Sequence, residues 1–175
     1  MSIMGVRFIY FSGVREEITP ELIEDGPSEV AGVGGPEPSV ALGQLGQHLT
    51  GVSFLEIGDS VKSWPGQVDV PDDPDEREMF FYDHGIDPEA TPEELEVALN
   101  DLRWGLSVVE LKDQLRDALA AVPADDYRRV AEQWAAIEEL RGLSVDEVLT
   151  VLGRLCSLAR QAVGQKQHLY CWVML

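Results

Sequence analysis

The sequence predicts an α+β fold: a small sheet that includes the N-terminal and C-terminal strands, packed by about four to six helices concentrated in the C-terminal half. The β-branched and aromatic run at residues 6–11 is typical of a strand. The run at residues 168–175 is apolar on both faces, which is typical of a strand inside a covered sheet. Strong helical periodicity begins after residue 91. We expect the two terminal strands to pair.

The first half of the chain alternates short elements with breakers. Thr19 and Pro20 favour a short helix over residues 20–24, because threonine caps free amides and proline suits the first helical position. Residues 28–39 hold many glycines and prolines and predict a loop. A helix is expected over residues 40–49, with Gly51 as its C-terminal cap. Residues 52–57 fit a strand or a helix, and residues 64–66 indicate a turn with a packed tryptophan.

Four amphipathic helices are expected after residue 91. Two of them open with a capping residue followed three positions later by glutamate, at residues 91–94 and 144–147, and residues 107–110 repeat that pattern. Asp125 is expected to cap the third of the four, which ends at Gly142. The last helix should run from residue 144 to residue 163 and end at Gly164.

Bulk properties bound the class of protein. A chain of 175 residues with 45% hydrophobic content predicts a single globular domain over residues 1–175. No apolar run approaches the roughly 20 residues of a membrane span, and the start shows no secretory signal. Two cysteines do not make a disulfide framework. A reducing bacterial cytoplasm is therefore the expected location.

The charge of the chain is its one global anomaly. Thirty-two Asp and Glu against 13 Lys and Arg give a net charge of −19. Such a field repels nucleic acid and anionic membranes and attracts basic proteins, although it also serves solubility alone. Eleven carboxylates and one arginine lie in residues 66–94. Because four prolines interrupt this stretch, we expect residues 66–90 to form an extended acidic surface segment, with residues 79–82 as an aromatic anchor or short strand.

Motifs for metals and cofactors are missing from the sequence. His48, His84 and His168 lie far apart, and the carboxylates of residues 72–76 lack the EF-hand pattern. The glycines of residues 32–35 lack the residues of a phosphate loop or a dinucleotide site. Cys156 and Cys171 fall on apolar faces, where cysteine packs as a small hydrophobe. We expect no metal and no cofactor.

The most suggestive local cluster for catalysis is Tyr82-Asp83-His84. A carboxylate beside a histidine and an aromatic residue can form an acid/base dyad, so Asp83 and His84 are candidate catalytic residues of a small enzyme. Adjacent residues in an extended chain point in opposite directions, however, and the sequence names no third partner. A pocket around His84 would favour the enzyme, and a solvent-facing His84 would count against it.

Several short motifs follow one another in a distinctive order along the chain. They are an initial strand with Met4-Gly5, a short helix at residues 20–24, Leu49-Thr50-Gly51 after an early helix, Thr91-Pro92-Glu93-Glu94 at a helix start, a Leu106-Ser107 opening with Leu111, and a closing helix and strand. In this order the chain resembles the YfbM-like family of small uncharacterised bacterial proteins. The family's Asp-x-Asp-Lys-x-Trp run before Leu-Thr-Gly is missing here. The resemblance implies an α+β fold and no activity.

The sequence therefore favours a non-catalytic interaction protein, of the immunity or inhibitor type, that binds a basic protein partner. The alternative is a small enzyme with its site around Tyr82-Asp83-His84. A third possibility, a mimic of double-stranded DNA, would need regular rows of carboxylates, which the proline-broken segment does not suggest. The identity of the partner and the oligomeric state are left open. The expected partner-binding residues are Asp69, Asp72, Asp73, Asp75, Glu76, Phe80, Phe81 and Tyr82.

Overall fold

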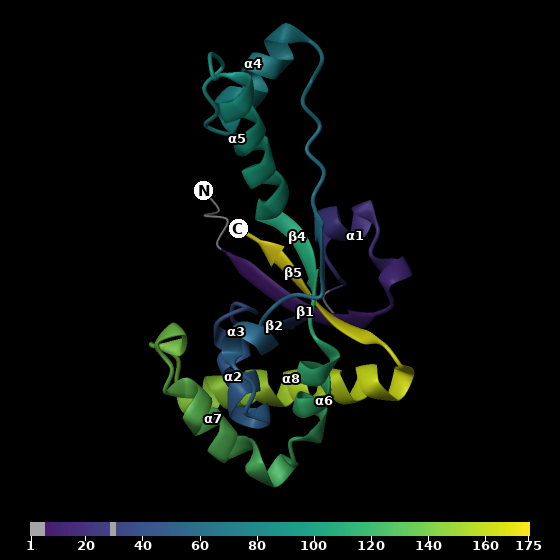
Figure 1. The fold of residues 1–175 in the computed structure, drawn as a ribbon, viewed down its shortest axis with the longest axis vertical. Helices are drawn as coiled ribbons and strands as arrows, with labels where there is room; N and C mark the ends of the chain where they lie inside the picture. The colour runs from purple at the N-terminus through teal and green to yellow at the C-terminus, as the bar shows by residue number, and fades with distance from the viewer. Residues whose placement is uncertain (1–5, 29–30) are drawn as a thin grey trace.

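The computed structural model describes residues 6–28 and 31–175, and it confirms the α+β class. Five strands form one antiparallel sheet in the order β2-β1-β5-β4-β3, with β1 near the start of the chain and β5 at its end (Figure 1). The strands are β1 Arg7–Gly13, β2 Val33–Gly34, β3 Lys62–Pro65, β4 Leu106–Glu110 and β5 His168–Met174.

The described residues also form eight α-helices and three short 3-10 turns. The predicted count of four to six helices did not include α4, and it left α3 open as a strand or a helix. The helices are α1 Pro20–Asp25, α2 Ala41–Thr50, α3 Phe54–Ile57, α4 Pro74–Asp83, α5 Pro92–Gly105, α6 Asp113–Ala121, α7 Tyr127–Ala135 and α8 Val145–Gln165. The 3-10 turns are η1 Arg15–Glu17, η2 Ala124–Asp126 and η3 Glu138–Leu140.

The terminal strand β5 lies at the centre of the sheet. It pairs with β1 on one side and β4 on the other, so the predicted pairing of the two terminal strands is confirmed. Leu169 and Cys171 face the larger core, and Tyr170 and Trp172 face a smaller one on the opposite side. All four are buried. Their alternation explains why β5 is apolar on both faces.

Helices cover the two faces of the sheet unequally. Helices α2, α6, α7 and α8 gather on the side of the larger core (Figure 1), and α8 supplies Leu152, Leu155 and Cys156 to it. On the other face, the short helix α1 packs on Trp172, whose indole N–H donates to the carbonyl oxygen of Ile23 at 2.8 Å.

The predicted helix start at residues 107–110 is wrong, because these residues form β4. Ser107 and Glu110 match a capping box by type and spacing, but Val108 and Val109 are β-branched and pair with Trp172 and Cys171 of β5. Glu110 is 1% exposed and binds Arg15 instead of capping a helix. The helix begins only at Asp113.

Other predictions also need correction or completion. Asp125 lies in the 3-10 turn η2 instead of capping a helix, and α7 ends at Ala135 instead of at Gly142. Trp64, expected in a turn, lies in β3 opposite Val108. Residues 52–57, left open between strand and helix, contain the short helix α3. Gly164 does not end the last helix, since α8 continues to Gln165 and Lys166 closes it with a positive φ of 55°.

The acidic segment is not extended throughout, so the prediction for residues 66–90 is wrong in part. Its aromatic residues lie in α4, because Pro74 occupies the first turn of a helix rather than breaking one. The Asp73 carboxylate caps that helix by accepting from the backbone N–H groups of Asp75 and Glu76 at 3.0 and 3.1 Å. Residues 79–82 are therefore helical, and their side chains diverge around the helix axis.

Candidate functional site

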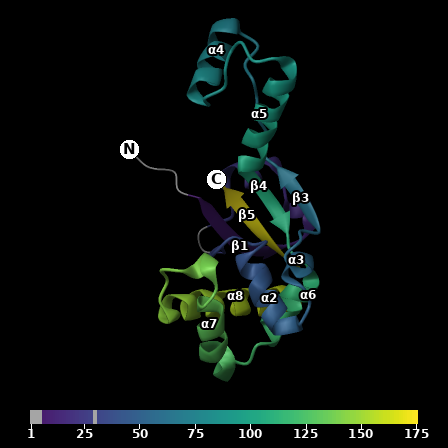
Figure 2. The same ribbon diagram turned by 60° about the vertical axis from the view of Figure 1, so that its left-hand side comes forward.

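Residues 67–105, called here the arm, project from the sheet as an insertion between two paired strands. The chain leaves β3, rises as an extended segment, turns at α4 and returns through α5 into β4 (Figures 1 and 2). At the base, Pro65 pairs with Ser107, and the Gly66 N–H donates to the carbonyl oxygen of Leu106 at 2.6 Å. Without the arm, β3 and β4 would be neighbouring strands of a hairpin.

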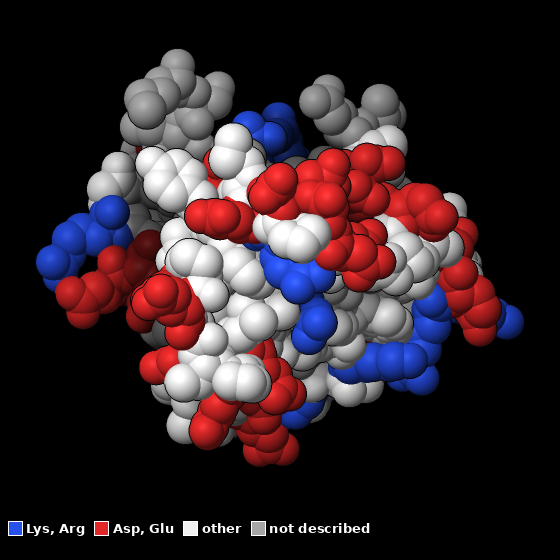
Figure 3. All heavy atoms as spheres, turned by 90° about the horizontal axis from the view of Figure 1, so that it is seen from above, with Lys and Arg blue, Asp and Glu red and all other residues white. Residues whose placement is uncertain are grey.

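The arm holds much of the negative charge of the protein. It has thirteen Asp and Glu against two Arg, so it carries −11 of the total −19. Seen from the arm end, carboxylates outnumber basic groups on the face nearest the viewer (Figure 3). Arg77 is not ion-paired with these carboxylates within the described residues, and its guanidinium donates instead to the carbonyl oxygens of Pro71 and Asp72. None of the arm carboxylates forms an ion pair within the described residues.

The five acidic residues predicted to bind a partner all lie on the arm and are exposed. Asp69 and Asp72 lie in the extended segment before α4, Asp73 caps that helix, and Asp75 and Glu76 lie in its first turn. Because Asp73 is also a cap, its replacement by alanine would damage the helix as well as remove a charge.

The three predicted aromatic anchors point to different surroundings. Phe81 is 6% exposed and, with the buried Ile86, belongs to the interior of the arm. Tyr82 is 81% exposed, and Phe80 is half-buried. Of the three, only Tyr82 and Phe80 can therefore meet a partner without a rearrangement of the arm.

Asp83 and His84, the candidate acid and base, both face solvent at the end of α4. The Nδ1–H of His84 donates to the carbonyl oxygen of Phe80 at 2.8 Å, and the imidazole lies 4.3 Å from the Phe80 ring. No hydrogen bond joins Asp83 to His84 within the described residues. The surrounding depression is an open groove on the surface of α4. This arrangement gives little support to an acid/base dyad.

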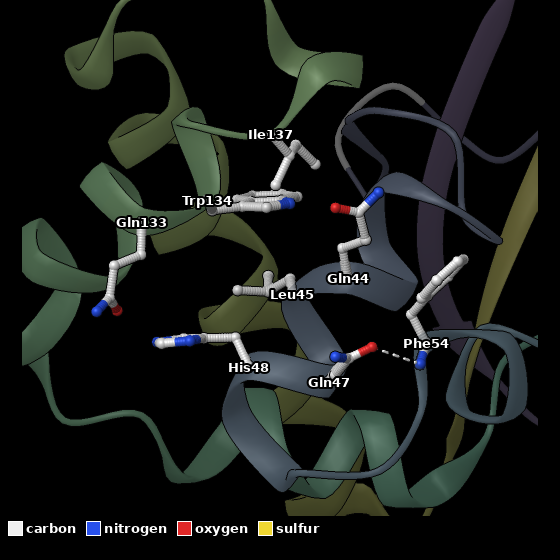
Figure 4. Close-up of a pocket in the computed structure, with 8 residues that line it drawn as sticks. All are labelled: Gln44, Leu45, Gln47, His48, Phe54, Gln133, Trp134 and Ile137. Carbon is white, nitrogen blue, oxygen red and sulfur yellow. Dashed lines mark hydrogen bonds between the residues drawn. The ribbon is translucent and has the colours of Figure 1, made fainter.

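A groove of about 650 Å³ lies between α2 and α7 (Figure 4). The amides on its walls already have partners: Gln47 accepts from the Phe54 N–H at 2.9 Å, and Gln44 donates to Glu139 at 3.1 Å. The indole N–H of Trp134 donates to the carbonyl oxygen of Ala41 at 2.8 Å. These contacts hold α2 against α3, α7 and η3, so the polar groups that line the groove serve the packing of these elements.

A second polar cluster, which sequence reasoning missed, lies beside the end of β4. The Arg15 guanidinium in η1 donates twice to the Glu110 carboxylate, through Nε and Nη2, each at 2.8 Å. The Glu110 side chain is 2% exposed and that of Arg15 48%. Hydrogen bonding to Glu110, and then its charge, raise the pKa of Arg15 above the ordinary value. The partners are 95 residues apart in the sequence, so no local spacing predicts such a pair.

Two more groups extend this cluster. His168 contacts the Asp113 carboxylate through Nδ1 at 2.8 Å, and Arg116 contacts the same oxygen at 3.0 Å. Tyr170 lies between Phe11, Trp64 and His168, with ring centroids 5.3, 5.9 and 6.4 Å away. Its hydroxyl is buried and has no hydrogen-bond partner within the described residues. Burial, and then the charge of Glu110, raise the pKa of Tyr170.

Replacing Tyr170 with phenylalanine should not destabilise the protein. Because the buried hydroxyl lacks a partner, its removal should change the free energy of unfolding by between about 0 and +1 kcal/mol in favour of the fold. Tyr10→Phe is the matched control: that hydroxyl is also buried but donates to the carbonyl oxygen of Pro36 at 2.5 Å, so its loss should cost about 1 kcal/mol. Chemical denaturation measures both. A loss for Tyr170→Phe equal to the control would show that the hydroxyl has a partner, such as an ordered water.

The chemistry of the remaining reactive groups is limited. Cys156 and Cys171 are free thiols in the core; burial raises the pKa of Cys156 to about 11 and also raises that of Cys171. Across residues 6–28 and 31–175, no three His, Cys, Asp or Glu side chains gather to hold a metal ion. None of the helices in the described part has the length and apolar character to span a bilayer.

No family model, curated protein or solved structure matches this chain. The resemblance to the YfbM-like family stays a prediction from the order of its motifs. Met4 and Gly5 lie outside the described residues; residues 49–51 close α2, and Thr91 opens α5. The Leu106-Ser107 motif, expected at a helix start, lies in β4.

Proposed function

We propose that this chain is a non-catalytic binding protein, of the immunity or inhibitor type, that captures a basic protein partner with its arm. The observation that carries the proposal is the arm itself, a projection with a charge of −11 whose carboxylates are not ion-paired within the described residues. Unpaired carboxylates on a projection attract a basic partner over a distance and set the specificity of the encounter.

The exposed apolar groups of the arm give the proposal a contact surface. None of the 14 residues of α5 is buried, and Val97 is 58% exposed. On α4, Met79 is 64% exposed and Tyr82 is 81% exposed. Large apolar side chains amid carboxylates suit an interface in which charge guides the approach and apolar contact holds the complex. The free buried thiols agree with a reducing cytoplasm, where we place the protein.

Removing four arm charges should weaken the capture of basic proteins more than removing four charges elsewhere. The arm variant is Asp72→Asn, Asp73→Asn, Asp75→Asn and Glu76→Gln, and it keeps the cap of α4 because asparagine caps helices as well as aspartate does. The control variant has the same net charge and replaces four exposed carboxylates of the sheet-and-helix body: Glu24→Gln, Asp25→Asn, Asp59→Asn and Glu132→Gln. Basic proteins of a cell extract should elute from the immobilised arm variant at clearly lower salt than from wild type or the control.

The proteins that elute are identified by mass spectrometry and the strongest is purified. Its Kd for the arm variant should be about tenfold or more weaker at low ionic strength, with a reduced dependence on salt. Equal elution and equal Kd for the arm and control variants would show that the arm is not the binding surface.

A further inference from the structure

Helix α4 presents two rows of side chains along one face. Residues four apart in a helix lie one turn above another on the same face. Asp75, Met79 and Asp83 make the first row, with a thioether between two carboxylates. In the second row, Glu76 is followed by Phe80 and then, immediately after the helix, by His84. The two rows together line an open groove of about 480 Å³.

The groove combines apolar surface with negative charge. Phe80 and His84 hold their rings 4.3 Å apart with an interplanar angle of 33°, so they form a tilted aromatic wall, and Met79 next to them is 64% exposed. The three carboxylates lie within one or two turns of that wall and have no ion-pair partners among the described residues. The wall offers contact area, and the carboxylates attract a cation.

We infer that this groove, called here the α4 groove, holds an arginine side chain of the basic partner. The inference rests on the proposed function. The aliphatic stem of arginine packs on apolar surface such as Met79, and its planar guanidinium stacks on aromatic rings such as Phe80. The same guanidinium binds carboxylates in a fixed fork geometry, which lysine lacks. The groove therefore favours arginine over lysine as the anchor of the partner.

The inference predicts that side chains of the α4 groove matter more than matched side chains elsewhere on the arm. The probes are an oligoarginine peptide and an oligolysine peptide of equal length, titrated into the full chain at low ionic strength. Met79→Ser is paired with Val97→Ser, since both residues are exposed and apolar and Val97 lies outside the groove. Asp83→Asn is paired with Asp101→Asn, which removes the same charge from α5.

Each groove variant should weaken binding of oligoarginine about fivefold, and each control less than about twofold. Wild type should prefer oligoarginine to oligolysine, and Phe80→Leu, which keeps apolar volume but removes the ring, should lose that preference. Circular dichroism verifies that all five variants keep the helices of the arm.

The outcomes separate the groove from the proposed function. Equal effects of groove and control variants, or no preference for arginine, would overturn the groove while the charged arm remained the binding surface. Absence of peptide binding by wild type would also overturn it, even if basic proteins were still retained. Loss of selective retention in the arm-charge experiment would instead overturn the proposed function.

Discussion

A variant in which Asn-Gly replaces residues 67–105 is expected to fold and to lose all affinity for the basic partner. The replaced arm lies between two strands that already pair, and the Gly66 N–H already donates to the carbonyl oxygen of Leu106. A two-residue Asn-Gly loop closes such a hairpin in the turn type that the twist of paired strands favours. The large core draws nothing from the arm, as its buried residues come from the sheet and from α2, α3, α6, α7, α8 and the segments beside them.

Circular dichroism and thermal unfolding measure the first half of this expectation. The variant should lose the helical signal of α4 and α5, which are 10 and 14 residues long, and should keep one cooperative transition. Removal of the arm changes the net charge from −19 to −8. The immobilised variant should no longer retain the basic partner. A variant that fails to fold would show that the arm supports the sheet; a folded variant that still binds would place the interface elsewhere.

The parts of the fold that the sequence predicted are those in which local pattern and tertiary packing agree. β5 is apolar on both faces because it lies between two strands and two cores, so its composition reports its place directly. The capping residues Thr19, Thr91 and Ser144 each accept from the backbone N–H of the third helical residue, as their sequences indicate. At these three helix starts the nearest neighbours along the chain are also the partners in space.

The failures occur where a distant partner outweighs the local signal, or where one local signal hides another. Ser107 and Glu110 have the spacing of a capping box, but their backbone pairs with β5 in the sheet. The Glu110 carboxylate accepts from the guanidinium of Arg15 instead of from a helix start. In α4, the number of prolines nearby predicts a broken segment, although Asp73 and Pro74 form a good helix start. The sequence identifies the acidic and aromatic residues of the candidate site but not their faces, since an extended chain and a helix distribute the same residues differently.

The α4 groove illustrates this limit. In an extended chain, Asp75, Met79 and Asp83 would be spread over more than about 25 Å, at about 3.3 Å per residue. In α4 they form one row, about 12 Å long at about 1.5 Å per residue. The helix, rather than the sequence alone, brings these three residues into one row.

Replacing Arg15 with methionine is expected to lower the melting temperature by roughly 10 °C, the largest stability effect we expect from a single charged residue. The variant leaves the Glu110 carboxylate, 2% exposed, without the two N–H donors that compensate for its burial. Glu110→Gln should cost much less, because the neutral amide is cheaper to bury and the half-exposed Arg15 can turn to water. The cost is therefore unequal between the two partners.

The double variant Arg15→Met and Glu110→Gln distinguishes this explanation from simple loss of packing. It should recover most of the melting temperature lost by Arg15→Met alone, since it no longer buries an unpaired charge. If the single and double variants melted at the same temperature, the guanidinium would stabilise the fold by contact alone, and the charge of Glu110 would carry no penalty.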